Sequence, residues 1–198
     1  MLYHIGIFIY PEAEVLDFAG PFEVFSTANR IGSLNWKIHL ISEQGGLVQA
    51  RGNFPVQSHY SLDDHPKLDL LIVVGGVHSK QYRNPRVAHW LKQQDQFTDR
   101  TCSVCTGVFF LANAGLLVGR KVTTHWEDQA DLQCTYPDLT VTERKRFIVD
   151  GKYVTSGGIS AGIDMSLALV AEMAGEELAN KTAHQMEYVW GGMTLIDY

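Results

Sequence analysis

The sequence has no excess of positive charge and no long apolar segment. Its 16 Lys and Arg residues face 22 Asp and Glu residues, which gives a formal net charge of −6. This charge gives no indication of the basic surface that is typical of nucleic-acid binding. No apolar run approaches the roughly 20 residues that span a bilayer. The apolar residues 1–10 lack a basic segment and a cleavage site, so they predict a first strand and not a signal peptide. We therefore expect neither a nucleic acid nor a membrane as a partner.

Cysteine is scarce as well. The 198 residues contain three cysteines, an odd number that argues against a disulfide framework and predicts a reducing, cytoplasmic location. Repeats, linkers and low-complexity segments are also missing. The length suits one well-buried domain, so we predict a single domain over residues 1–198.

Apolar runs alternate with segments of helical spacing. Residues 3–10 and 68–76 are continuous apolar runs, typical of strands covered on both faces. Pro21 suits the first turn of a helix, and Asn84 with Pro85 marks the start of another. Further strands are expected at 36–42, 101–105 and 121–125, hairpins at 47–58 and 146–155, and helices at 21–30, 84–99, 106–115, 127–134, 161–174 and 176–188. This order predicts one α/β domain with a mainly parallel sheet.

Cys105 stands where a short apolar strand changes into a helix-like segment, within residues 101–115. Because a helix N-terminus favours negative charge, this position favours the thiolate. Gly107 permits a tight turn that leaves the sulfur exposed, as in the nucleophile elbow of serine hydrolases. From this context alone, a buried structural cysteine is an equally good interpretation.

Four predicted strand ends carry polar, small or reactive residues. The carboxyl ends of parallel strands form the usual ligand-binding edge of such a sheet. The residues at these four strand ends could supply an acid, backbone N–H groups, a nucleophile and a side of the pocket that forms hydrogen bonds. They are Glu14 to Asp17, Gly75 with Gly76, Cys105 with Thr106, and His125 with Trp126. Glu14 and Glu23 are alternative acids, although Glu23 falls inside a helix.

The cysteine pair and the remaining histidines could indicate a redox site or a metal site. Cys102 and Cys105 form a Cys-x-x-Cys, but Cys102 lies inside the strand, whereas a redox motif places its first cysteine at the helix start. The other histidines show no ligand spacing, so we expect no metal and no cofactor. They are His4, His39, His59, His65, His89 and His184.

Five segments together resemble the DJ-1/PfpI (ThiJ) superfamily, in the right order and over nearly the whole chain. They are Leu16–Val24, Val73–Gly76, Ser103–Gly107, Thr123–Trp126 and Gly158–Met165. Within the superfamily the chain is most similar to isonitrile hydratases and to the ligand-binding domains of AraC-type regulators. The resemblance implies a flavodoxin-like three-layer sandwich, a cysteine at a nucleophile elbow, a small-molecule substrate and a homodimer.

The resemblance also assigns roles to single positions. It implies that Cys105 is the elbow cysteine and that Asp17 is the acid against its sulfur. The backbone N–H groups of Gly76 and Thr106 would stabilise an oxyanion. The walls of the substrate pocket would include Gly75, His125 and Trp126.

The sequence departs from the superfamily at two places. Its proteases carry a histidine directly after the cysteine, and Thr106 at that position argues against peptidase activity. The loop after Gly76 continues with Val77, His78 and Ser79, without the further glycine of many relatives, so the pocket should differ in shape.

A thiolate and a carboxylate in contact repel each other, so Cys105 and Asp17 should share one proton. We expect a thiolate beside a protonated Asp17. Such a pair supplies a nucleophile and an acid. The leading hypothesis is a lyase that hydrates an isonitrile to an N-substituted formamide through a covalent thioimidate. The alternatives are a glyoxalase-like activity on reactive carbonyls and a non-enzymatic redox or ligand sensor. Because the sequence ends soon after the last predicted helix, we do not expect a DNA-binding tail.

Overall fold

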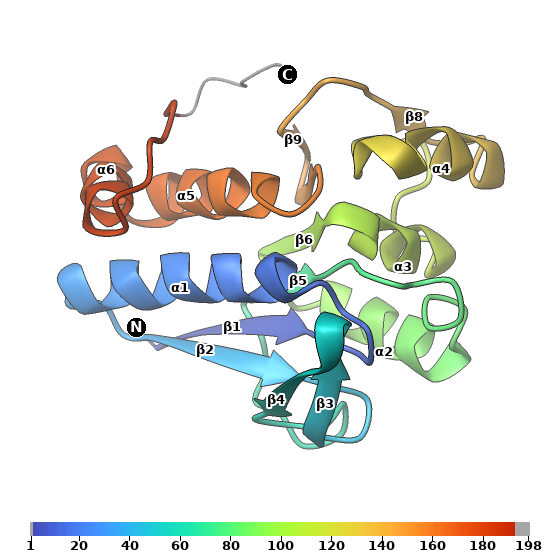
Figure 1. The fold of residues 1–198 in the computed structure, drawn as a ribbon, viewed down its shortest axis with the longest axis horizontal. Helices are drawn as coiled ribbons and strands as arrows, with labels where there is room; N and C mark the ends of the chain where they lie inside the picture. The colour runs from blue at the N-terminus through green and yellow to red at the C-terminus, as the bar shows by residue number, and fades with distance from the viewer. Residues whose placement is uncertain (1, 193–198) are drawn as a thin grey trace.

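A six-stranded sheet forms the centre of the protein, whose computed structural model describes residues 2–192. Its strand order is β2-β1-β5-β6-β10-β9, parallel throughout except for β9 at one edge (Figure 1). The strands are β1 (Tyr3–Phe8), β2 (Trp36–Ile41), β5 (Leu70–Val73), β6 (Arg100–Val104), β9 (Phe147–Asp150) and β10 (Tyr153–Ser156). All four residues of β5 are buried, as expected for a strand covered on both faces. The predicted mainly parallel α/β fold is confirmed.

Helices cover both faces of this sheet. On one face, α1 (Val15–Ile31), α5 (Ala161–Ala174) and α6 (Glu176–Gln185) pack against one another (Figure 1). The second layer contains α2 (Pro85–Asp95) and α3 (Val108–Asn113). Phe8 of β1 contacts this second layer, because its ring lies 5.5 Å from Trp90 and 5.9 Å from Phe110 between centroids. The predicted three-layer, flavodoxin-like sandwich is therefore also confirmed. No helix within residues 2–192 is both long and apolar enough to span a membrane.

Helix α1 begins earlier than predicted. The sequence placed Pro21 in the first turn, but the helix starts at Val15 and encloses Pro21, which is buried. An interior proline leaves one helical hydrogen bond unmade, at a cost of about 3 kcal/mol. Burial of Phe18, Val24 and Phe25 on the same helix offsets this cost. Asp17 consequently lies in the first turn of α1.

Other predicted boundaries also shift. Helix α2 ends at Asp95 and not near Asp99. The predicted strand 121–125 is reduced to β7 (Lys121–Val122), which pairs with β8 (Thr140–Val141) outside the main sheet. The short helix α4 (Gln129–Thr135) lies between these two strands in the chain.

The predicted hairpin of residues 47–58 is confirmed as β3 (Gly46–Ala50) and β4 (Phe54–Ser58), joined by a short helical turn at Arg51–Asn53. The hairpin docks on the loop after β1. The Glu12 N–H donates to the Gln49 carbonyl at 2.9 Å, and the Arg51 N–H donates to the Ala13 carbonyl at 2.9 Å. This docking brings Arg51 to the carboxyl end of the sheet.

Candidate active site

Cys105 follows directly on β6 and adopts a strained backbone conformation. Its φ angle is +56°, in the left-handed region that few residues other than glycine adopt. Two hydrogen bonds hold this conformation: the Cys105 N–H donates to the Gly157 carbonyl at 3.2 Å, and its carbonyl accepts from Thr124 Oγ1 at 2.8 Å. A helical turn, Cys105–Gly107, then leads into α3. Cys105 therefore has the backbone of a nucleophile elbow.

Two glycines permit the close packing around this elbow. A Cβ atom on Gly107 would lie 2.0 Å from the Val73 carbonyl oxygen, so only glycine lets the turn approach β5. A Cβ atom on Gly75 would lie 2.7 Å from Cys105 Cβ and 2.8 Å from Asp17 Oδ2. The missing side chain of Gly75 is thus what lets the thiol and the carboxyl stand next to each other.

Asp17 is fully buried beneath the cysteine. Its Oδ2 accepts from the Gly75 N–H at 3.0 Å, and its Oδ1 accepts from the Ile159 N–H at 3.1 Å. Burial raises the pKa of Asp17 to about 7, with a further contribution from the Glu14 charge, while the two backbone N–H groups oppose the shift. Since this pKa lies above the unfolded value of 3.8, the contribution of Asp17 to stability is complete below pH 3.8. It is lost as the pH rises through about 7.

Cys105 is only 7% exposed, and this burial favours the neutral thiol over the thiolate. Burial raises the pKa of Cys105, the charge of Asp17 raises it further, and the Thr106 N–H opposes both. The thiolate beside a protonated Asp17, expected from the sequence, stays a prediction, and burial of the sulfur opposes it. The two groups still form one coupled pair.

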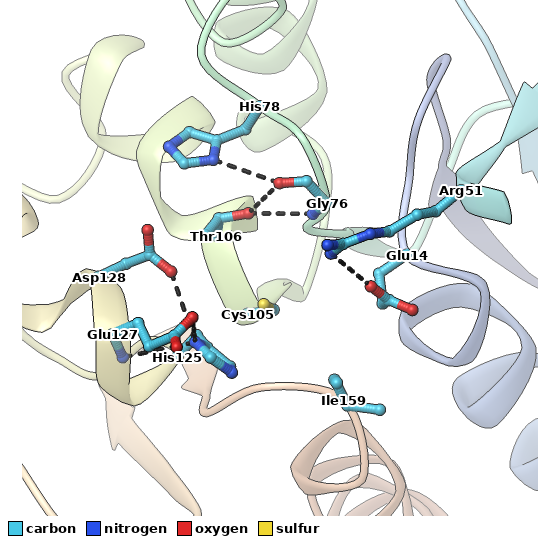
Figure 2. Close-up of a pocket in the computed structure, with 10 residues that line it drawn as sticks. All are labelled: Glu14, Arg51, Gly76, His78, Cys105, Thr106, His125, Glu127, Asp128 and Ile159. Atoms are coloured by element: carbon cyan, nitrogen blue, oxygen red, sulfur yellow. Dashed lines mark hydrogen bonds and ion pairs between the residues drawn. The ribbon is translucent and has the colours of Figure 1, made fainter.

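A small polar cavity of about 100 Å³ opens at Cys105. Figure 2 shows Cys105 at its centre, with an ion pair on one side and a histidine–carboxylate contact on the other. Arg51 Nη1 lies 2.9 Å from Glu14 Oε2, and His125 Nδ1 lies 3.5 Å from Asp128 Oδ2. The cavity is lined by Glu14, Arg51, Gly76, His78, Cys105, Thr106, His125, Glu127, Asp128 and Ile159.

Thr106 and Gly76 bond to each other at the cavity wall (Figure 2). The Gly76 N–H donates to Thr106 Oγ1 at 3.0 Å, and the same hydroxyl donates back to the Gly76 carbonyl at 3.1 Å. The Gly76 N–H is thus occupied in this structure. The oxyanion role predicted for it requires that this bond open.

The structure brings most of the predicted site residues together. Cys105, Gly76, Thr106 and His125 line the cavity, while Asp17 and Gly75 lie directly behind the sulfur. Trp126 does not line this cavity. It is 72% exposed and belongs to a neighbouring groove.

Sequence reasoning missed several residues of the cavity. Arg51 reaches it from the β3–β4 turn, and Ile159 from the loop after β10. Neither lies on a predicted strand end with a chemical signal of its own. Within residues 2–192, no group of three or more His, Cys, Asp or Glu side chains is arranged to hold a metal ion.

Cys105 has a left-handed backbone conformation between a parallel strand and a helix, and a buried carboxyl lies behind it. This arrangement defines an α/β protein of the nucleophile-elbow class. Residues 4–172 match the DJ-1/PfpI family. The chain belongs to this family, which confirms the resemblance seen in its sequence motifs.

Its relatives include both regulators and an enzyme. The chain is 36% identical over 177 residues to the HTH-type transcriptional regulator CdhR of Pseudomonas aeruginosa, covering 89% of this chain and 52% of CdhR. It thus spans about half the length of that regulator. It is 31% identical over 189 residues to the isonitrile hydratase of Pseudomonas putida, covering 95% of this chain and 79% of that enzyme.

Among solved structures, a ThiJ/PfpI family protein from Pseudomonas syringae has a similar fold. The TM-score is 0.86 at 25% identity, covering 95% of this chain and 76% of the other. The agreement extends over nearly all of the α/β sandwich described above.

Proposed function

We propose that this protein is a cysteine-dependent lyase that hydrates isonitriles to N-substituted formamides. One observation carries the proposal: Cys105 stands at a strained elbow, beside a buried carboxylate and in front of a cavity of about 100 Å³. Strained backbone and a perturbed carboxyl are typical of catalytic sites. The similarity to an isonitrile hydratase over 79% of that enzyme supports the same reaction class.

In the first step, the Asp17 carboxylate takes the proton of the Cys105 thiol as Sγ bonds to the terminal carbon of the isonitrile. The same proton then passes from Asp17 to that carbon. The product is a neutral thioimidate, R–N=CH–S–Cys, and Asp17 is again a carboxylate. General acid–base help of this kind contributes about 10²–10⁴-fold to a rate.

In the second step, water adds to the thioimidate carbon. Asp17 accepts one proton of the water as the oxygen bonds to carbon, and passes that proton to the nitrogen. Asp17 then takes the hydroxyl proton of the tetrahedral adduct as the C–S bond breaks and R–NH–CHO is released, and returns it to the sulfur. The Thr106 N–H, which already faces the sulfur, is placed to stabilise developing negative charge there.

A ligand-sensing role is the second candidate. It is favoured by the 36% identity to CdhR, of which this chain matches 52%. In that role Cys105 would be oxidised, or the cavity would bind an effector. A glyoxalase-like reaction would use the same pair to form a hemithioacetal with a reactive carbonyl. The homodimer and the cytoplasmic location expected from the sequence stay predictions.

Turnover of benzyl isocyanide by three forms of the protein tests the proposal. We expect the wild type to form N-benzylformamide, and Cys105→Ala to fall to the background rate, because the attacking sulfur is gone. Cys102→Ala is the matched control: it removes an equally buried sulfur three residues away, and most activity should remain. Chromatography of the product gives the rates.

Other outcomes point to the alternatives. If the wild type consumes no isonitrile but removes methylglyoxal in a Cys105-dependent way, the glyoxalase-like reaction is supported. If it consumes neither, and peroxide adds oxygen selectively to Cys105 by mass spectrometry, the sensor role is supported. Each of these results contradicts the lyase proposal.

A further inference from the structure

A second, larger depression adjoins the cysteine cavity. This groove, of about 590 Å³, is lined by Thr124, His125, Trp126, Gln129, Glu143, Arg144, Gly158, Ile159 and Ser160. Two residues, His125 and Ile159, line both the groove and the cavity. Its main apolar side chains are exposed, Trp126 by 72% and Ile159 by 39%. An apolar surface therefore begins where the reactive cavity ends.

Ile159 adopts a conformation that its side chain disfavours. Its φ angle is +54°, and a β-branched residue in this region is a genuine outlier. Its backbone N–H donates to Asp17, a task that any residue with this backbone could perform. Glycine would do so without strain, and glycines stand directly before it at Gly157 and Gly158. The backbone role therefore does not explain why isoleucine is present.

The cysteine cavity is much smaller than the groove beside it. The cavity measures about 100 Å³ and the groove about 590 Å³, so a bulky group finds more room in the groove. The reacting end of an isonitrile, two atoms long, fits this space. The wall shared by His125 and Ile159 leads from this cavity to the groove, where a larger group on the nitrogen would lie.

We propose that Ile159 is a specificity-determining residue, and that the groove beside it receives an apolar substituent of the substrate, packed against Ile159 and Trp126. This inference rests on the proposed function, because it concerns the same reactive carbon at Cys105. The side chain of Ile159 provides the apolar surface at the point where the substrate passes from cavity to groove.

A pair of substrates tests this assignment. Methyl isocyanide ends inside the cavity, whereas benzyl isocyanide reaches the groove. We expect Trp126→Ala to lower kcat/KM for benzyl isocyanide by about tenfold, the size of a lost apolar contact, and for methyl isocyanide by less than about twofold. Ile159→Gly should shift the preference in the same direction. This variant keeps the backbone N–H that donates to Asp17 and removes the backbone strain, so the midpoint of its thermal unfolding should fall little.

Phe97→Ala is the matched control, because Phe97 is an aromatic residue, 53% exposed, that does not line either depression. It should change neither rate. If Trp126→Ala and Ile159→Gly lower kcat/KM equally for both substrates, these residues have no role in selectivity and the inference is wrong. It is also wrong if Trp126→Ala changes the mass of the assembly in solution without changing selectivity, since the groove would then contact a second copy of the chain.

A binding measurement separates failure of the inference from failure of the proposed function. Calorimetry with Cys105→Ala should show that N-benzylformamide binds more tightly than N-methylformamide, and that adding Trp126→Ala abolishes the difference. If the wild type hydrates no isonitrile and this difference is still found, the groove assignment stands while the lyase function falls. If isonitriles are hydrated and no difference is found, the function stands and the groove assignment is overturned.

Discussion

Two buried aspartates stand in the first turns of two helices, yet they have different surroundings. Asp164 of α5 is 3% exposed, and its Oδ2 accepts from Arg146 Nε at 2.7 Å. Its Oδ1 accepts from the Tyr188 hydroxyl at 3.1 Å. Asp17 of α1 is fully buried, accepts from two backbone N–H groups and contacts the Cys105 thiol, and it has no ion pair in the part of the chain that the structure describes.

The difference separates a structural carboxylate from a reactive one. A buried carboxylate paired with arginine joins elements, here the segment before β9, helix α5 and the segment that follows α6. A buried carboxyl without a cation has a raised pKa and can exchange its proton near pH 7. Only Asp17 stands against a thiol, and only Asp17 can act as an acid and a base there.

The largest expected effect comes from Asp17→Asn. An amide can neither take the thiol proton nor return it to carbon, so we expect kcat/KM for benzyl isocyanide to fall about 10²–10⁴-fold. Glu23→Gln serves as the control, since Glu23 is an exposed carboxylate on the same helix, bonded to Thr27. Equal losses in the two variants would mean that the acid is another residue. Urea unfolding shows whether Asp17→Asn is folded.

Asp164→Asn should act on stability instead. It removes the carboxylate that accepts from Arg146 Nε, and breaking such a largely buried ion pair costs about 3–5 kcal/mol. The activity per folded molecule should change little, because Asp164 does not line the cavity. Asp150→Asn is the comparison variant: the surface pair of Asp150 with Arg120 should be worth about 1 kcal/mol or less. Denaturant midpoints measure both. A large loss of turnover at normal stability would contradict the structural role.

Sequence reasoning found the parts of this site that lie at strand ends. Asp17, Gly75 and Cys105 follow three strands of one parallel sheet, whose carboxyl ends form the usual ligand-binding edge, and the resemblance to the superfamily assigned Asp17 and Cys105 to one site. Arg51 could not be found in this way. It reaches the cavity because a hairpin docks on the loop after β1, which is a tertiary contact without a local pattern.

Two further features of the site could not be predicted from the sequence. The left-handed conformation of Ile159 opposes its own β-branched preference, so no propensity indicates it. The sequence indicates the helix terminus at Cys105, which favours the thiolate, but it does not indicate the burial that raises the pKa of the thiol. The sequence therefore indicates which reactive groups lie at the site, whereas only the folded structure shows how far they are shielded from solvent.

The most direct test of the catalytic pair is the pKa of Asp17 itself. A ¹³C NMR titration of protein labelled at the aspartate carboxyl carbons can identify its signal by the absence of that signal in Asp17→Asn. The uncompensated burial of Asp17 predicts a midpoint of about 7. A midpoint near the ordinary value of 3.8 would show that Asp17 holds no proton to exchange near neutral pH, and it would contradict the shared-proton account of Cys105 and Asp17.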